Sequence, residues 1–306
     1  MTVAGSPVIG IGEVLWDLLT DAPRLGGAPC NVLVHLRRLG HEVALVSAVG
    51  RDDLGRAAVL ELAVAGVDTS SVATVSSPTG RAEVVLAADG TAGFSIASGG
   101  AYESVDLTAI EIARLARTSP AALVFGTLAQ RSSTVRRSTV ELAAALPDAV
   151  RLYDVNLRSG LWDQDLVGRL AAIATFVKMN RDEAAVVAPF FGVPWPGTEQ
   201  FCRALRHLLG LRGVAVTAGA SGAALLVDDE FVELPAVPVA VVDTIGSGDA
   251  FAAALVDGLI ADRPATAILR RSIALGALVA TRAGATPAWA ASDLAALEAE
   301  SGAASL

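Results

Sequence analysis

Short runs of valine, isoleucine and leucine alternate along this chain with longer alanine- and leucine-rich segments, and this alternation constrains the fold most. The short runs end at Gly, Asp or Pro, whereas the longer segments carry apolar residues at helical spacing. Such alternation is typical of βαβ units around a parallel sheet, and predicts a doubly wound α/β domain whose mainly parallel sheet is flanked by helices. We expect strands at 7–12, 42–49, 122–125, 151–155, 176–179, 214–217 and 223–227, and helices at 31–39, 55–65, 107–118, 133–145, 199–209 and 250–260.

Two stretches break this pattern, "LWDLLTDAPRLGGAP" and "SSPTGRAEVVLAADGTAGFSI". Both are rich in turn residues and short of helix signals. The second is typical of a β-hairpin, with Ala-Asp-Gly at the turn between two alternating runs. We therefore expect a small β appendage beside the main sheet.

Composition excludes several classes of protein. The 306 residues are 53% apolar, enough for a buried core in one large domain or two smaller ones. The net charge of −9 and the scattered arginines argue against nucleic acid as a partner. No run approaches the ~18 apolar residues that span a bilayer, and the N-terminus lacks the pattern of a secretory signal, so we expect a cytoplasmic protein without a membrane segment. Cys30 and Cys202 are expected to be reduced thiols.

The stretch "DTIGSGDAF" at 243–251 joins a valine-rich run to a helical segment. Valines 239, 241 and 242 end a strand or extended run, while Gly246 and Gly248 free the backbone to turn its N–H groups inward. An extended run, a glycine loop and a helix N-terminus together make an anion site. Asp249 in the first helical turn is either a favourable first-turn acid or a base that takes a proton from a hydroxyl attacking the anion.

Lys178 is the only lysine in the chain, and no glycine-rich loop precedes it. Neither a Walker A loop nor the lysine of a protein kinase is therefore available. If the loop at 243–251 binds phosphate, we expect glycines and arginines to hold it.

A second glycine turn precedes the first expected helix, in "PRLGGAPCNVLVHLRRLG". Gly26 and Gly27 make a tight turn, and Pro29 suits the start of a helix. Asn31 either bonds the loop backbone or binds a ligand hydroxyl. We place His35 on an exposed or partly buried flank of the helix, with a structural role.

Polar residues follow several of the expected strands. In an open parallel sheet the carboxyl ends of the strands lie at one edge, where ligands bind. Each such residue could also make local loop bonds, but together with Asp249 they form the set that a nucleotide-dependent transferase needs. They are Asp154, Asn156 and Arg158 after one strand, Asn180 and Glu183 after the next, and Thr217, Gly219 and Gly222 after a third.

Other enzyme classes find less support. "VIGIGEVLWD" begins like a dinucleotide fingerprint, but Leu15 stands where the third glycine belongs and no helix follows. Asp17 is instead either an exposed turn residue or a ligand of substrate hydroxyls. The chain has no GxSxG elbow, and its three histidines are neither clustered nor at metal spacing, which disfavours a serine hydrolase or a zinc enzyme.

These segments resemble the ribokinase-like carbohydrate kinases, the phosphofructokinase-B family, over almost the full length. "GGAPCNVLVHLRRLG" and "DTIGSGDAFAAALVDGL" carry most of the resemblance, with "VGRDDLG", "PTGRAEV", "VFGTLAQRS", "DVNLR", "VKMNRDE" and "VTAGASG" in order between them. The resemblance implies an α/β core at 1–12, 31–78 and 103–306 and a β-sheet lid at 13–30 and 79–102. It implies ATP and Mg²⁺ as cofactors and a small sugar as the substrate.

The resemblance also implies roles for individual residues. Asp249 would be the base, and the N–H groups of Gly246, Ser247 and Gly248 would bind the γ-phosphate. Glu183 with Asn180 would organise Mg²⁺ through water, and Thr217, Gly219 and Gly222 would line the ATP site. The sugar would be held by Asp17, Gly27, Asn31, Phe94 and Arg158.

Within the family the segments look most like bacterial fructokinases, which makes D-fructose the expected sugar. 2-keto-3-deoxygluconate kinases, ribokinases and nucleoside kinases share much of the pattern, and a non-catalytic sugar or nucleotide sensor is the alternative outside enzymes. Monomers and dimers both occur in the family, and an exposed apolar lid face could pair two subunits, so a homodimer is one expectation. Many members also bind K⁺, but Ala288 stands where ribokinases have a serine, which puts K⁺ activation in doubt. The matching positions are Asp243, Ile245, Ala280, Ala283 and Gly284.

Overall fold

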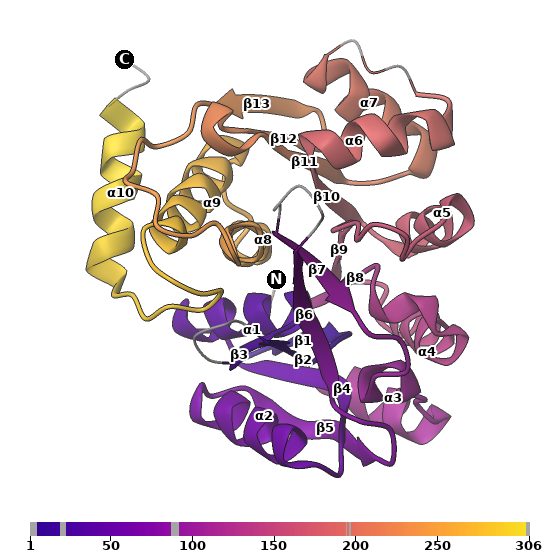
Figure 1. Ribbon diagram of the computed structural model, residues 1–306. Helices are drawn as coiled ribbons and strands as arrows, with labels where there is room; N and C mark the ends of the chain where they lie inside the picture. The colour runs from indigo at the N-terminus through magenta and orange to yellow at the C-terminus, as the bar shows by residue number, and fades with distance from the viewer. Residues whose placement is uncertain (1–4, 19–22, 87–91, 194, 196, 304–306) are drawn as a thin grey trace.

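A computed structural model describes residues 5–18, 23–86, 92–193, 195 and 197–303, and the side chains of 83–86, 92–94 and 301–303 lie outside this description. Its centre is a nine-stranded sheet in the order β13-β12-β11-β10-β9-β8-β1-β4-β5 (Figure 1). The strands are β1 (Val8–Ile11), β4 (Val43–Gly50), β5 (Asp68–Val75), β8 (Ala122–Gly126), β9 (Val150–Asp154), β10 (Phe176–Asn180), β11 (Gly213–Thr217), β12 (Ala223–Val227) and β13 (Glu230–Leu234).

Most of this sheet is parallel, as expected. From β5 through β1 to β11 each neighbouring pair runs parallel, and only β12 and β13 are added antiparallel at one edge. The chain starts in the middle, because β1 lies between β4 and β8. The connections therefore lead away from β1 in both directions, which leaves a crevice at the carboxyl ends of the strands.

Helices cover both faces of the sheet, as Figure 1 shows. β1 is buried along its whole length, and its alternate side chains enter two cores: Ile9 and Ile11 one, Val8 the other. The first core packs against α3 (Ala109–Ala116), α4 (Ser133–Ala144), α5 (Gln164–Ile173), α6 (Arg181–Val187) and α7 (Thr198–Leu209). The second packs against α1 (Ala28–Arg38), α2 (Asp53–Val64), α8 (Ser247–Ile260) and α9 (Ala265–Ala280), with α10 (Ala291–Ala303) outside α8 and α9.

A second, four-stranded sheet has the order β3-β2-β6-β7. Its strands are β2 (Leu15–Leu18), β3 (Pro23–Gly26), β6 (Gly80–Leu86) and β7 (Ala92–Ile96). β6 and β7 pair antiparallel, which confirms the expected hairpin, although the Ala-Asp-Gly turn itself lies outside the described residues. The Trp16 indole N–H donates to the Leu54 carbonyl at 3.0 Å, which rests this small sheet on α2.

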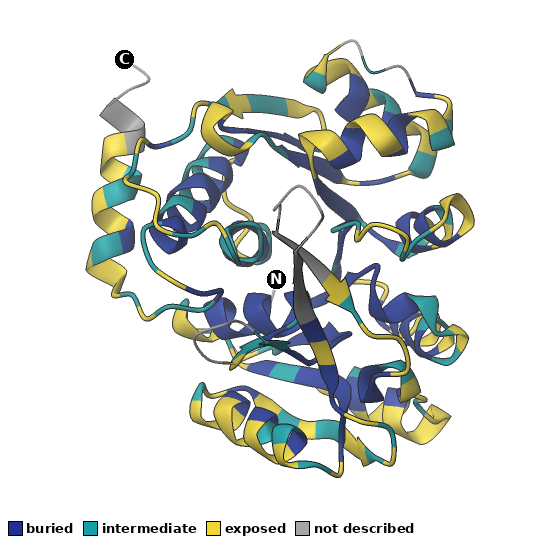
Figure 2. Cartoon of the chain, viewed as in Figure 1, coloured by how far each residue is buried: buried dark blue, intermediate teal, exposed yellow. Residues whose placement is uncertain are grey.

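The expected strands all form, within one residue at either end, and the expected helices begin and end within three residues of their predicted bounds. Figure 2 shows why the pattern was informative: the inner strands of the large sheet are buried while the outer faces of the helices are exposed. One expectation needs correction. The valine-rich run before Asp243 is a loop outside the sheet, and Val241 and Val242 are exposed. Among the described residues, no helix is both long and apolar enough to cross a bilayer.

Ion pairs around Asp257 hold the last three helices together. The Asp257 carboxylate on α8 is 6% exposed and lies 3.0 Å from both His41 Nε2 and Arg271 Nε, and 3.4 Å from Arg263 Nη1. Arg271 on α9 also contacts Glu298 on α10 at 2.8 Å. Burial alone would raise the pKa of Asp257, but the His41 hydrogen bond and the two guanidinium groups outweigh it and lower that pKa.

Replacing Asp257 by Asn should lower the free energy of unfolding at neutral pH by about 1–3 kcal/mol, because the arginines lose a buried carboxylate. A carboxyl with a depressed folded-state pKa contributes stability above its unfolded pKa and loses it as the pH falls through the folded value. The difference between the two proteins should therefore narrow below about pH 4. Urea unfolding over that pH range tests this, with the exposed Asp262→Asn as control. An equal loss in both variants would contradict the assignment.

Candidate active site

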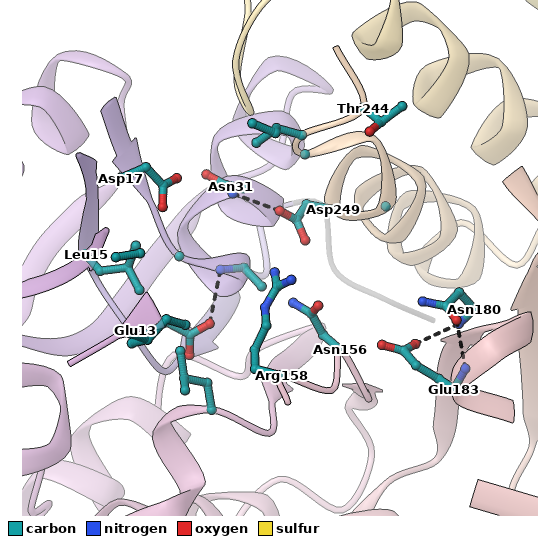
Figure 3. A pocket seen from close by; sticks show the side chains of 18 of the residues that line it. Glu13, Leu15, Asp17, Asn31, Asn156, Arg158, Asn180, Glu183, Thr244 and Asp249 are labelled. Atoms are coloured by element: carbon teal, nitrogen blue, oxygen red, sulfur yellow. Dashed lines mark hydrogen bonds between the residues drawn. The ribbon is translucent and has the colours of Figure 1, made fainter. Parts of the chain in front are cut away.

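A cavity of about 360 Å³ lies at the carboxyl edge of the large sheet, between the small sheet and the N-terminus of α8. Many of the residues expected in the site line it: Asp17, Gly27, Asn31, Arg158, Asn180, Glu183, Thr217, Ile245, Gly246, Gly248 and Asp249. Figure 3 shows Asp17, Asn31 and Asp249 on one side, with Asn180 and Glu183 at the other end. The remaining expected residues, Ser247, Gly219, Gly222, Asp243, Ala280, Ala283 and Gly284, are not among its lining residues. The Phe94 side chain lies outside the described ones.

Gly246 begins α8 in a backbone conformation that suits only glycine. Its φ is 75°, and a Cβ there would lie 2.4 Å from both Cα and O of Ala285. Because the chain turns here without a side chain, the first turn of α8 faces the cavity with its partly positive N-terminus. Ser247 is turned away, since its N–H donates to the Thr244 carbonyl at 3.2 Å and its hydroxyl donates to the Gly276 carbonyl at 2.8 Å.

Asp249 lies in the first turn of α8 and receives a hydrogen bond from Asn31 on α1, with Nδ2 and Oδ2 2.8 Å apart. Burial and, to a smaller extent, the nearby Asp154 carboxylate raise the pKa of the Asp249 carboxyl, to about 7 in all. The Asn31 bond, Lys178 and Arg158 act in the opposite direction. A carboxylate with a pKa near neutrality is suited to accept a proton at the pH of most cells.

Lys178 also lines the cavity, a position that the sequence did not predict. Its ammonium is buried beside Gly248, 3.2 Å from where a Cβ on that glycine would lie. It forms a salt bridge with the Asp154 carboxylate, in which Lys178 Nζ lies 2.9 and 3.0 Å from the two oxygens. Lys178 and Asp154 occupy facing positions on neighbouring parallel strands, β10 and β9. The pairing of β9 with β10 is therefore the feature from which the position of the Lys178 ammonium, at the carboxyl edge of the sheet, could have been inferred.

The turn before α1 depends on Glu13, which the sequence reasoning did not single out. Gly27 has a φ of 121°, and a Cβ there would lie 2.2 Å from the Glu13 carbonyl oxygen. The Glu13 carboxylate accepts the Ala28 N–H at 3.2 Å and is 4% exposed. Burial raises the pKa of Glu13. The turn presents Asn31, in the first turn of α1, toward Asp249 (Figure 3).

Arg158 is the cation on the small-sheet side of the cavity. Burial raises the pKa of Glu13, of Asp17 and of Asp154, and the Arg158 guanidinium opposes that rise in each. Asn156, two residues before Arg158, has a φ of 37°, a positive value that residues other than glycine seldom adopt. Its side chain also points into the cavity (Figure 3).

Asn180 and Glu183 form a reciprocal cap at the start of α6. The Asn180 side chain accepts the Glu183 N–H and the Glu183 carboxylate accepts the Asn180 N–H, both at 2.8 Å. The other Glu183 oxygen accepts the Leu157 N–H at 2.8 Å. Glu183 thus caps the helix and also lines the cavity. Its carboxylate can accept further hydrogen bonds there, for example from water bound to a divalent cation.

The loop after α9 lies directly behind Gly246. Asp243 bridges the two segments, because its carboxylate accepts the Ile245 N–H at 2.9 Å and the Gly284 N–H at 3.0 Å. The Ala280 carbonyl accepts the N–H groups of Val242 and Asp243.

The expectation for His35 is wrong: this residue is not on an exposed or partly buried flank of α1 but is fully buried.

Similar folds are known among sugar kinases. The structure of an uncharacterized sugar kinase from Pyrococcus horikoshii in complex with ATP superposes with a TM-score of 0.80 at 25% identity, over 96% of this chain and 99% of that chain. A mainly parallel α/β sheet, a small β-sheet and a carboxylate beside a glycine-rich helix N-terminus therefore place the protein in the ribokinase-like class of folds.

Sequence comparison identifies the family within that class. A model of the pfkB family of carbohydrate kinases matches residues 21–291. Fructokinase-1 of Zea mays is 29% identical over 92% of this chain and 93% of its own length. Aminoimidazole riboside kinase of Salmonella typhimurium is 30% identical over 80% of this chain and 78% of its own length. The chain belongs to the pfkB family of carbohydrate kinases, which are phosphotransferases, and the resemblance stated above is confirmed.

A Gly246→Ala substitution should cost more than about 2 kcal/mol in the free energy of unfolding, because the new Cβ needs a left-handed backbone and overlaps the Ala285 backbone. Gly168→Ala is the matched control: it lies inside α5, where its Cβ would meet no atom within 4 Å, and should leave stability unchanged or raise it by up to about 1 kcal/mol. Urea denaturation of both variants measures the difference. Equal stabilities would show that the loop behind Gly246 does not constrain it.

Proposed function

We propose that the protein is an ATP- and Mg²⁺-dependent kinase that transfers the γ-phosphoryl group to a primary hydroxyl of a small sugar, with D-fructose the favoured substrate. The observation that carries this proposal is the Asp249 carboxylate, held by Asn31 at the N-terminus of α8 inside the cavity. The base, the anion site and the hydroxyl-binding groups that we propose would share this cavity.

In this proposal Asp249 takes the proton from the acceptor hydroxyl as that oxygen attacks phosphorus. Its pKa of about 7 leaves it ionised at slightly alkaline pH yet basic enough to accept a proton. Asn31 donates to one carboxylate oxygen and orients the other. The acceptor oxygen is thus deprotonated where the phosphoryl group arrives.

The N-terminus of α8 would receive that phosphoryl group. We assign the backbone N–H groups of Gly246, Ser247 and Gly248 to the anion hole, although Ser247 must first give up its turn bond. The space beside Gly248 faces the Lys178 ammonium, so an anion there gains a charged donor as well as the helix dipole. Asp154 keeps this ammonium in place before the phosphate enters.

We assign nucleotide binding to the other end of the cavity, where Asn180 and Glu183 lie, and to Thr217, Gly219 and Gly222. Glu183 would hold Mg²⁺ through water, a mode that suits this cation because it keeps part of its hydration shell. Mg²⁺ would supply charge neutralisation on the phosphate oxygens. Thr217 lines the cavity, while the two glycines form the turn between β11 and β12.

The acceptor end would hold the sugar through Asp17, Gly27, Asn31 and Arg158. Its charges favour an uncharged acceptor. Glu13, Asp17 and Asp249 bring three carboxylates, and Arg158 already interacts with all of them. A carboxylate on the substrate, as in 2-keto-3-deoxygluconate, would meet net negative charge, which supports fructose over that acid.

The small sheet would act as a lid. We propose 13–30 and 79–102 as the lid and 1–12, 31–78 and 103–306 as the core. Closure of the lid over the sugar would exclude water and so limit hydrolysis of ATP. Pairing of two lids in a homodimer is compatible with this division, and the same fold could serve as a sugar sensor without turnover.

Release of ADP across a panel of acceptors tests the proposed function. The panel comprises D-fructose, ribose, 2-keto-3-deoxygluconate, fructose 6-phosphate, tagatose 6-phosphate and adenosine. We expect the highest kcat/KM with fructose and low values with the three anionic acceptors. An enzyme most active on an anionic acceptor would contradict the charge argument, and sugar binding without ADP release would indicate a sensor.

Replacing Asp249 by Asn should lower kcat by roughly 10²–10⁴-fold, the usual contribution of a general base, while the affinity for sugar stays within a few-fold. Steady-state assays and sugar titration by calorimetry measure the two quantities. Asp262→Asn, at an exposed position after α8, serves as control and should match the unaltered protein. Undiminished turnover in Asp249→Asn would exclude this residue as the base.

The pH dependence should follow the ionisation of Asp249. Only the ionised carboxylate accepts a proton, so kcat/KM should fall about tenfold per pH unit as the pH decreases below about 7. Asp154→Asn removes a like charge that raises this pKa, and should move the acidic limb to lower pH. The exposed Asp148→Asn should leave it in place. A limb that does not respond to Asp154→Asn would mean that another group titrates.

A further inference from the structure

Four consecutive backbone carbonyls in the loop after α9 accept hydrogen bonds from side chains. His35 Nε2 donates to the Ala285 oxygen at 3.0 Å. The two Arg38 terminal nitrogens donate to the oxygens of Thr286 at 2.9 Å and Pro287 at 2.8 Å. Arg282 donates to the Ala288 oxygen. Two of these donors come from α1, the helix that also carries Asn31.

The role of His35 follows from its two ring nitrogens. The Trp289 indole N–H donates to Nδ1 at 3.1 Å, so the proton of the neutral ring lies on Nε2, which donates to Ala285. Burial and, to a smaller extent, Arg38 outweigh the Ala285 bond and lower the pKa of His35 to about 4. The ring therefore stays neutral, with both hydrogen bonds satisfied, at physiological pH.

The segment that His35 holds forms the back of the anion site. Ala285 is the residue against which a Cβ on Gly246 would collide, so a shift of Ala285 moves the start of α8. Asp243 ties the same two segments together from the other side, through the N–H groups of Ile245 and Gly284.

Helix α1 therefore contacts α8 at two points, directly at Asp249 and through the Ala285 loop at Gly246. Asn31 on α1 bonds Asp249 on α8, and one helical turn later His35 bonds the loop that supports Gly246 at the start of α8. Helix α1 thus fixes the base at one point and the anion site at another. The position of the sugar-binding helix and the position of the phosphate site are set by the same rigid element.

The expected cation positions do not form a comparable set. The Ala280 carbonyl already accepts two backbone N–H groups. Both Asp243 oxygens accept backbone N–H groups, and Ala288 offers no side-chain oxygen. Potassium needs several oxygens turned toward one point, whereas the oxygens of Asp243 and Ala280, two of the five expected positions, are turned toward N–H donors.

We propose that His35 and Arg38 are positioning residues that hold the 285–287 carbonyls against Gly246, and that this clamp sets the anion site without a bound monovalent cation. The kinase should then turn over equally well with and without K⁺. This inference rests on the proposed kinase activity for its kinetic readouts, but a bound cation can also be detected without turnover.

The first test uses the unaltered protein. We expect kcat with fructose and MgATP to agree within twofold in potassium and choline salts of equal ionic strength. The melting temperature should likewise not rise when K⁺ replaces choline, because a ligand that binds the folded state stabilises it. A more than tenfold activation by K⁺, or a K⁺-specific rise of several degrees, would overturn the proposal.

The second test removes the clamp. Arg38→Ala on the surface and His35→Phe in the interior should each lower kcat by about tenfold or more while the sugar Kd changes little, because the phosphate site moves relative to a retained sugar site. His35→Gln keeps a donor toward Ala285 and should restore much of kcat. Arg37→Ala, next to Arg38 on the exposed side of α1, is the control and should leave both values unchanged.

These measurements separate the clamp from simple stabilisation. A structural role alone would lower the melting temperature of Arg38→Ala without lowering kcat at temperatures where the variant is folded, and that result would overturn the proposal. If His35→Phe does not fold, Arg38→Ala still decides. A wild-type protein that phosphorylates no acceptor would count against the proposed function, and the K⁺ melting experiment would then still test the clamp.

Discussion

The hydrogen bond between Asn31 and Asp249 is the contact on which the rest of the site depends. It joins two residues 218 positions apart, at the first turns of α1 and α8. Each helix can begin where it does only because a glycine with positive φ precedes it, Gly27 in one case and Gly246 in the other. Both glycines lie so close to another segment of backbone that a side chain would not fit. The two glycine-rich segments therefore act together: they bring the Asn31 amide and the buried Asp249 carboxylate to hydrogen-bonding distance.

Electrostatics explain the raised pKa of the Asp249 carboxyl. Asp249 shares the cavity region with Asp154, Glu183, Glu13 and Asp17, opposed mainly by Lys178 and Arg158. Removing so many carboxylates from water costs free energy unless cations and N–H groups compensate, and the compensation here is incomplete. The result is a raised pKa at Asp249 and a cavity ready to receive positive charge along with phosphate. In the proposed function, burial that is unfavourable for stability is what suits Asp249 for proton transfer.

The parts of this structure that have a local signal in the sequence could be predicted. The buried strands show as apolar runs, Gly27 and Gly246 stand at turns before helical segments, and Asp249 lies at a helix start, so each could be predicted. The edge strands β5 and β13 were not predicted, because their exposed residues interrupt any apolar run. The burial of His35 depends on Trp289, 254 positions away, and the place of the Lys178 ammonium depends on strand register. Such facts arise only when distant segments pack together, and periodicity along the chain does not contain them.

The central claim is that Asp249 and the N-terminus of α8 direct a phosphoryl group onto a primary hydroxyl of a sugar rather than onto water. Product analysis by phosphorus NMR tests this most directly. After incubation with D-fructose and MgATP, the account predicts a phosphate monoester whose phosphorus couples to a CH₂ group of the sugar, formed in equal amount to ADP. Release of inorganic phosphate with the sugar unchanged, or a phosphorus coupled to a ring CH, would contradict it.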